Sequence, residues 1–114
     1  MNLLVCISKT PETTAKISFS GDNKEFNTDG VQFIMNPYDE WYSLVRALEL
    51  KEQLGSGKVV AINVGPASND IIIRKALAIG ADEAVRVNVA DNSAYSVAHH
   101  IADYAKSNDF DIVF

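Results

Sequence analysis

Apolar, β-rich runs spaced along the chain constrain its fold more than any other sequence feature. Residues 3–8 (LLVCIS) and 58–65 (KVVAINVG) are almost uninterrupted apolar runs, and residues 83–89 (EAVRVNV) form a third. Continuous runs of this length are typical of strands that are buried on both faces. A fourth run, FDIVF, occupies residues 110–114. Strands buried on both faces belong to parallel sheets, whose members must be joined by long crossover connections.

Helical periodicity fills the connections between these runs. Three segments carry apolar residues at spacings that place them on one face of a helix, the first at i, i+3, i+4 and i+7. The first segment follows Asn36, the second spans 69–78 and the third spans 93–106. Gly55 and Gly80 are suited to end the first two. Their apolar positions are Trp41, Leu44, Val45 and Leu48; Ile72, Ile73, Ala76 and Leu77; and Ala94, Val97, Ala98, Ile101 and Ala105. This alternation predicts an α/β fold, a parallel sheet with helices on both faces.

One connection does not fit the alternation. Between the first run and the first helix, AKISFS and the stretch around VQFIM flank GDNKEFNTDG, which is rich in Gly, Asp and Asn. Such residues favour tight turns, here at Gly21–Asp22 and Asp29–Gly30. We therefore expect a small antiparallel excursion, over residues 16–35, after the first strand.

Composition limits the class of protein. A chain of 114 residues is long enough for one domain with a core and too short for two, so residues 1–114 are expected to form a single α/β domain. Ten Lys and Arg against fifteen Asp and Glu give a net charge of −5, without the basic stripe that nucleic acid requires. No apolar run approaches the about 18 residues of a membrane span, and the first residues do not read as a signal peptide. A lone cysteine, Cys6, fits a reducing, cytoplasmic compartment.

Ligands of open parallel sheets bind beyond the carboxyl ends of the strands, where the strand order reverses. The positions to inspect are therefore the end of the first strand at Cys6–Ser8, the end of the second at Asn63–Pro66, and the end of FDIVF. No turn or cap follows FDIVF in the sequence, and a buried strand that stops there would leave a terminus inside the sheet. We therefore expect that the fold is truncated in strand four and that the domain belongs to a longer subunit.

The segment Asn36-Pro37-Tyr38-Asp39 has two interpretations. In one it is a well-made helix start, with Asn36 as N-cap, Pro37 at the first helical position and Asp39 two residues later. In the other, the same helix start also contacts a nucleotide through its unpaired N–H groups. Asp39 and Glu40 would repel a phosphate there, so a ribose or adenine contact is the better fit.

The remaining candidates are weak on residue type alone. Val64-Gly65-Pro66 follows a strand, but the chain has neither GxGxxG nor GxxxxGK[ST]. Cys6 lies within an apolar strand and reads as a packing residue rather than a nucleophile. His99 and His100 are adjacent, so on a helix they point about 100° apart and do not share a metal. We find no metal-ligand spacing and no nucleophile–base pair, and we predict no catalytic residues and no metal site.

Four segments resemble a known family. LLVCISKTPETTAKI (3–17), TDGVQFIMNPYDE (28–40), VGPASNDIIIRKALAIGADEAV (64–85) and DFDIVF (109–114) are similar, in this order, to the β subunit of electron transfer flavoprotein. The resemblance covers essentially the whole chain and about the N-terminal half of the family's subunit. It implies a Rossmann-like, adenine-nucleotide-hydrolase-like sheet that binds a nucleotide.

The resemblance also implies a chemistry. Members pair with an α subunit that holds most of a redox-active FAD, while β binds AMP or, in bifurcating members, a second FAD. Electrons pass from flavin dehydrogenases, such as those acting on acyl-CoA, to a quinone oxidoreductase or another acceptor. The chain would thus be part of an electron carrier rather than a stand-alone enzyme, since the flavin supplies the chemistry. The nucleotide contacts would fall on Cys6, Asn36, Pro37, Tyr38, Asp39 and Val64.

Some features depart from the family or leave alternatives open. A Lys is common directly after the Cys-Val of strand one, where this chain has Ser8 and only then Lys9. The family's phosphate-binding loop would follow Phe114, so these residues would hold at most the adenosine half of a site. The choice between AMP and a second FAD, and the donor and acceptor, stay open. The alternatives are a universal-stress-type adenine-nucleotide sensor and an interaction domain without a ligand.

Overall fold

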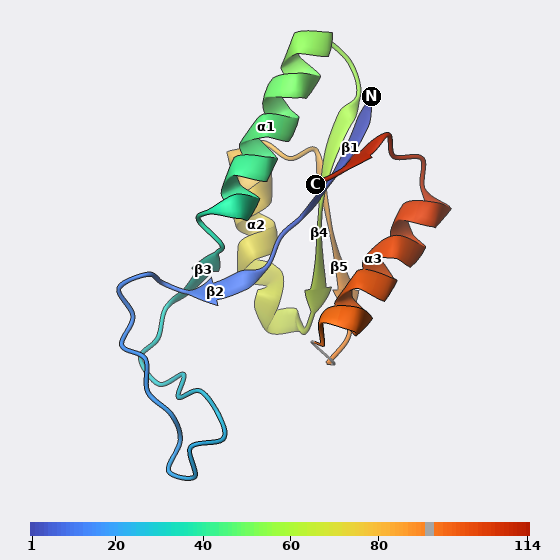
Figure 1. The fold of residues 1–114 in the computed structure, drawn as a ribbon. Helices are drawn as coiled ribbons and strands as arrows, with labels where there is room; N and C mark the ends of the chain where they lie inside the picture. Colours follow the sequence, from blue (N-terminus) through green and yellow to red (C-terminus); the bar gives the residue numbers. More distant parts are fainter. Residues whose placement is uncertain (91–92) are drawn as a thin grey trace.

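The central sheet has four parallel strands in the order β5-β4-β1-β6 (Figure 1). The computed structural model describes residues 1–90 and 93–114. The strands are β1 (Asn2–Cys6), β4 (Lys58–Gly65), β5 (Glu83–Asn88) and β6 (Ile112–Val113). β1 pairs with β4 from Asn2 opposite Lys58 to Cys6 opposite Ile62. The predicted parallel α/β sheet is confirmed, and β1 is the strand at which the order reverses.

Helices cover both faces of this sheet, as predicted. α1 (Asp39–Leu54) and α2 (Asp70–Ile79), the latter after the short 3₁₀ turn η1 (Ala67–Asn69), lie on one face, and α3 (Ala94–Ser107) lies on the other (Figure 1). The side chains of β1 and β4 alternate between the two faces because successive residues of a strand point in opposite directions. The first face buries Leu3, Val5, Ile7, Val59 and Ala61 beneath the two helices, and the second buries Leu4, Val60 and Ile62 beneath α3.

The α3 face is less completely covered than the other. No described residue of α3 is fully buried, and Ala94 and Ala98 of its predicted apolar stripe are exposed. Ile101 and Ala105 of the same stripe pack against the sheet. The core contacts of α3 therefore come from the C-terminal half of the helix.

The excursion after β1 is antiparallel, but its strands differ from the predicted ones. β2 (Lys9–Pro11) pairs with β3 (Phe33–Met35), and the chain between them forms an arm that projects from the body (Figure 1). AKISFS was expected to flank the turns as a strand and does not form one; it contributes a single bridge, Phe19 opposite Phe26. The prediction failed because the arm has no second layer to bury an apolar strand face, and Phe19 is 59% exposed.

The predicted ends of α1 differ in outcome. At its C-terminus, Gly55 adopts φ 71° and donates to the carbonyls of Lys51 and Glu52, the expected left-handed cap. At its N-terminus, the prediction that Asn36 caps the helix is wrong. The helix begins at Asp39. Tyr38 occupies the N-cap position, and no side-chain hydrogen bond caps the helix there. The Asn36 side chain instead accepts a bond from the Tyr38 N–H at 3.0 Å, which forms an Asx turn before the helix.

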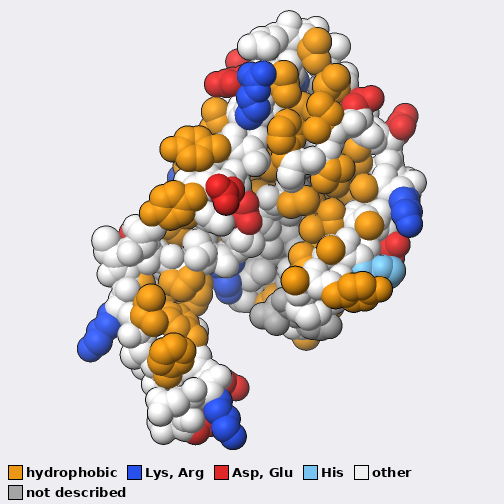
Figure 2. Space-filling model, viewed as in Figure 1, with side chains coloured by type: hydrophobic (Ala, Val, Ile, Leu, Met, Phe, Trp, Pro, Cys, Tyr) orange, Lys and Arg blue, Asp and Glu red, His pale blue; other side chains and the backbone are white. Residues whose placement is uncertain are grey.

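β6 forms one edge of the sheet. Backbone bonds from Phe114 N–H to Leu4 O (2.8 Å) and from Cys6 N–H to Phe114 O (2.9 Å) extend its pairing with β1. Val113 is 50% exposed on this edge. Figure 2 shows hydrophobic side chains gathered in a band between α1 and α3 on this side of the molecule. Among the described residues, β6 therefore combines an apolar surface with an outer edge that pairs with no further strand.

Candidate functional site

A cavity of about 410 Å³ opens beyond the carboxyl ends of β1 and β4. The two strand ends, the start of α1 and one face of α3 surround it. Its lining residues are Cys6, Ile7, Ser8, Lys9, Glu40, Asn63, Val64, Gly65, Pro66, Asn69, Ala90, Val97 and Ile101. The position agrees with the rule that open parallel sheets bind ligands at this edge. We call this space the strand-end cavity.

Glu40 fixes the end of β1 against the start of α1. Its carboxylate accepts bonds from the Ser8 N–H at 2.5 Å and from the Ser8 hydroxyl at 2.7 Å. The Asn36 N–H donates to Ser8 O at 3.1 Å, so Ser8 is held on both of its backbone polar groups. Hydrogen bonds to an ionised acceptor are among the stronger ones in proteins. The Ser8–Glu40 pair therefore sets the shape of this wall of the cavity.

Two buried asparagines fix the end of β4. Asn63 is 4% exposed and Asn69 is 8% exposed. Asn63 donates through Nδ2 to Ile7 O at 2.9 Å, and its Oδ1 accepts from Asn69 Nδ2 at 2.9 Å. The pair links the turn after β4 to the neighbouring strand β1. A side chain on Gly65 would occupy the space that the Asn69 amide fills, so glycine is required at this position.

Arg86 of β5 holds the same turn from the other side. Its Nε donates to Asp70 Oδ1 at 2.6 Å, and its Nη1 donates to Gly65 O at 3.0 Å. The guanidinium thus joins the end of β4 to the first residue of α2. Among the described residues, no buried side-chain N or O lacks a hydrogen-bond partner. The wall of the cavity is therefore a rigid and fully bonded frame rather than a loose loop.

Lys9 stands at the mouth of the strand-end cavity. Its Nζ lies 3.4 Å from Ser68 Oγ and 4.8 Å from the centre of the Phe33 ring. Phe33 lines a second hollow, described below. The lysine therefore places one positive charge in the lining of the strand-end cavity and close to a residue of the second hollow.

The structure separates the six residues expected to contact a nucleotide. Cys6 and Val64 both line the strand-end cavity. Asn36 reaches it only through its backbone bond to Ser8. Pro37 lines the second hollow instead, while Tyr38 is 64% exposed and Asp39 is also exposed. Within the NPYDE segment, the residue that lines the cavity is Glu40.

Several site residues were not predicted as contacts, although Ser8 and Asn63 lie at the strand ends that the sequence pointed to. Ser8 and Glu40 lie 32 positions apart and make contact only through the fold. A signal was present for Asn63, a polar residue inside the apolar run KVVAINVG, and for Arg86, a charge within EAVRVNV. A buried polar group must find a partner, so each of these residues could have been flagged as part of a fixed network.

Cys6 has a perturbed thiol. Burial, and secondarily the negative charge of Glu40, raise the pKa of Cys6 above its ordinary value. We expect iodoacetamide to alkylate folded Cys6 several-fold more slowly than unfolded Cys6 at pH 8, because the thiolate is the reactive form. The rate should be followed against pH by mass spectrometry of the peptide that contains Cys6. If the pH at which alkylation reaches half its maximal rate were the same in the folded and the urea-unfolded protein, the raised pKa would be contradicted. Restricted access alone lowers the maximal rate and does not shift this pH.

The histidine and acidic side chains of the described residues do not form a reactive centre. His99 Nε2 lies 3.4 Å from Asp103 Oδ2, whereas His100 Nδ1 lies 2.7 Å from Ser96 O, so the two imidazoles have separate partners. In the part of the chain that the structure describes, no group of three or more His, Cys, Asp and Glu side chains could hold a metal ion. No helix within the described residues has the length and apolar character needed to cross a membrane.

Known proteins resemble this chain over most of its length. Residues 24–114 match the family "Electron transfer flavoprotein domain". Electron transfer flavoprotein subunit beta of Bacillus subtilis is 36% identical over 117 residues, covering 99% of this chain and 44% of the relative. The human protein of the same name is 33% identical, covering 99% and 46%. Protein FixA of Azorhizobium caulinodans is 40% identical over 85 residues, covering 75% of this chain and 29% of the relative. The chain spans less than half the length of these curated relatives.

Proposed function

We propose, from the premise that this chain belongs to the electron transfer flavoprotein family, that it forms the nucleotide-binding part of a β subunit. The subunit would pair with an α subunit in the cytoplasm and carry electrons between flavin enzymes. Its relatives named subunit beta support the coarse assignment. The nucleotide, the partner and the electron donors are the parts that the experiments below must test.

The strand-end cavity is the observation that carries this proposal. It lies at the carboxyl ends of β1 and β4, and its volume of about 410 Å³ falls in the range of small-molecule sites. Apolar side chains of Ile7, Val64, Val97 and Ile101 line it, which suits the faces of an adenine ring. Cys6 and Val64 are the predicted contact residues that it contains.

The charges of the cavity support a particular orientation of the nucleotide. Lys9 at the mouth is the cation that could approach a phosphate, near Ser68 and the turn after β4. The negative charge of the Glu40 carboxylate at the other wall disfavours a phosphate there, even though this carboxylate accepts two hydrogen bonds from Ser8. We therefore place the adenosine part between Cys6 and Val64, with its phosphate toward Lys9. The turn Asn36–Asp39 would act by positioning Ser8 and Glu40.

The bound flavin would supply the redox chemistry, and this chain's residues would bind and orient nucleotide. The donors that we propose are flavin dehydrogenases, including those that act on acyl-CoA, and the acceptor is a quinone oxidoreductase or another carrier. The apolar band at the β6 edge (Figure 2) supports the proposal that another part of the protein packs against this edge. We propose that this edge is covered in the assembled heterodimer.

The decisive experiment identifies the nucleotides in the natural protein. The protein that contains this chain should be co-expressed with its α partner, purified, denatured, and its released nucleotides identified by chromatography and mass. One FAD and one AMP per heterodimer is the expected result. Two FAD per heterodimer would assign the second flavin, rather than AMP, to β and indicate a bifurcating carrier.

Two outcomes would overturn the proposal. Release of neither nucleotide would leave the strand-end cavity without its ligand. Tight binding of ATP by the β chain alone, with no flavin and no α partner, would identify a nucleotide sensor of the universal-stress type.

A Lys9→Gln variant, with Lys106→Gln as a control on exposed α3, separates a phosphate contact from a general loss of charge. Only Lys9→Gln should lower AMP retention.

A further inference from the structure

A second hollow, larger than the strand-end cavity, lies between the start of α1, the face of α2 and the strand β3. Its volume is about 510 Å³. It is lined by Gln32, Phe33, Ile34, Met35, Pro37, Trp41, Ile71, Ile72, Arg74 and Lys75. We call it the α1–α2 groove. It is separate from the strand-end cavity, because no residue lines both.

The walls of the α1–α2 groove are mostly apolar, and its charged groups are cationic. Seven of its ten lining residues are apolar, and the charged ones are Arg74 and Lys75. Among the described residues, no carboxylate lines it. The chain as a whole carries a net charge of −5, so a groove with two cations and no acid is unlike the average surface. This local charge favours an anion.

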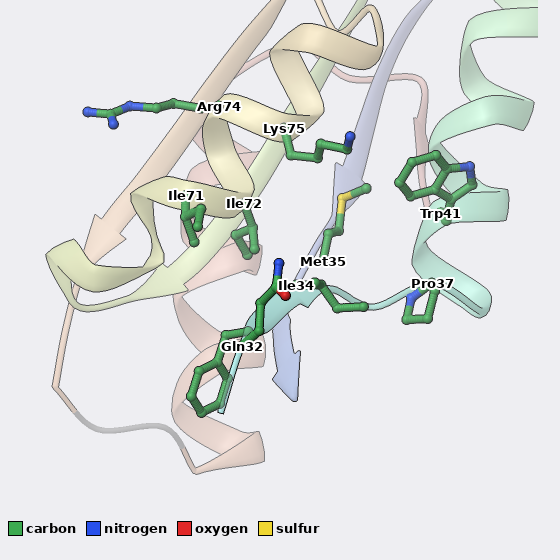
Figure 3. Close-up of a pocket in the computed structure, with 10 residues that line it drawn as sticks. Gln32, Ile34, Met35, Pro37, Trp41, Ile71, Ile72, Arg74 and Lys75 are labelled. Atoms are coloured by element: carbon green, nitrogen blue, oxygen red, sulfur yellow. The ribbon is translucent and has the colours of Figure 1, made fainter. Parts of the chain in front are cut away.

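The two cations are placed differently. Figure 3 shows Lys75 extending from α2 toward Trp41 of α1, whereas Arg74 extends from the same helix in another direction. Lys75 Nζ lies 5.8 Å from the centre of the Trp41 ring. No ion pair involves either cation within the described part of the chain. Lys75 is therefore the charge that an anion in the groove would meet first.

We propose that the α1–α2 groove binds a small amphiphile with an apolar body and a single anionic group. The body would lie against Ile71 and Ile72 on one side and Ile34 and Met35 on the other, which face each other in Figure 3. The anionic group would pair with Lys75, and the Trp41 ring would hold the lysine in place. Small-molecule sites typically combine such apolar walls with one or two fixed charges.

Octanesulfonate is a suitable probe, because its sulfonate stays ionised while its chain is apolar. Binding to the natural protein, purified with its partner, should be measured by titration calorimetry below the micelle concentration. 1-Octanol and octylammonium supply the same chain with no charge and with the opposite charge. We expect octanesulfonate to bind about tenfold more tightly than 1-octanol, and octylammonium to bind weakest, since a charge-assisted contact is made only by the sulfonate.

Matched variants locate the site. Lys75→Gln should lower octanesulfonate affinity about tenfold and leave 1-octanol unchanged, while Arg74→Gln has a smaller effect and Lys106→Gln on α3 has none. Ile71→Glu should abolish binding, and Leu77→Glu on the same helix should not. Both positions are already exposed, at 57% and 43%, so neither variant threatens the fold.

Three results would overturn the proposal. Equal affinity for the sulfonate, the alcohol and the ammonium would mean unselective apolar binding. Insensitivity to both Lys75→Gln and Ile71→Glu would place the probe elsewhere. Absence of binding in the assembled protein, with binding restored when the partner is removed, would show that the groove is a protein–protein contact instead. None of these outcomes depends on the nucleotide content of the strand-end cavity.

Discussion

Replacing Gly65 by Ala is expected to lower the free energy of unfolding by about 3 kcal/mol and to remove the nucleotide that we propose for the strand-end cavity. The added methyl group would overlap the Asn69 Nδ2 atom and lie 3.3 Å from Asn63 Oδ1. The Asn69 side chain is buried and cannot move aside without breaking its 2.9 Å bond to Asn63. Asn63 would then lose the partner that holds the end of β4.

Urea denaturation followed by circular dichroism measures the change in stability, and the released nucleotides measure the loss of ligand. Gly21→Ala is the matched control, because a methyl group there meets no atom within 4 Å and the backbone needs no left-handed conformation. Gly21→Ala should leave both properties unchanged. Unaltered stability of Gly65→Ala would mean that Asn69 adapts freely, and the frame around the cavity would not be rigid.

Replacing Glu40 by Ala is expected to cost about 2 kcal/mol of stability. The variant loses the two bonds from Ser8 and leaves the Ser8 N–H, formerly bound at 2.5 Å, without its carboxylate partner. It also removes the charge that contributes to the raised pKa of Cys6. Alkylation of Cys6 should therefore become faster at a fixed pH, although burial still holds the pKa of the thiol above its ordinary value.

Asp39→Asn provides the control for Glu40→Ala. Both residues lie in the first turn of α1, so both contribute a negative charge to the helix N-terminus. Asp39 is exposed, and none of the hydrogen bonds between described residues uses its carboxylate. Asp39→Asn should cost only a few tenths of a kcal/mol and leave Cys6 alkylation unchanged. Equal effects of the two variants would assign the role of Glu40 to the helix dipole rather than to Ser8.

The location of the site and part of its lining could be predicted from the sequence. The runs LLVCIS and KVVAINVG predicted two parallel strands, and the rule for open sheets directed attention to their carboxyl ends. Cys6 and Val64 line the cavity that the structure places there. The interpretation of Asn36 as the helix cap failed, because the helix begins at Asp39 and the Asn36 side chain accepts a bond from the Tyr38 N–H in a turn before it. An Asx turn and an N-cap use the same residue type, so the residue type alone did not distinguish them.

The sequence by itself determined the alternation of the parallel strands with the helices, and the ends of α1 and α2 at Gly55 and Gly80. These properties follow from periodicity and from glycine, and both act over a few residues. Only the tertiary structure decided that Glu40 pairs with Ser8, that Arg86 bonds the turn after β4, and that Pro37 faces a different hollow from Cys6. Such contacts join residues far apart in the chain, and they depend on where the packed sheet and helices bring the backbone.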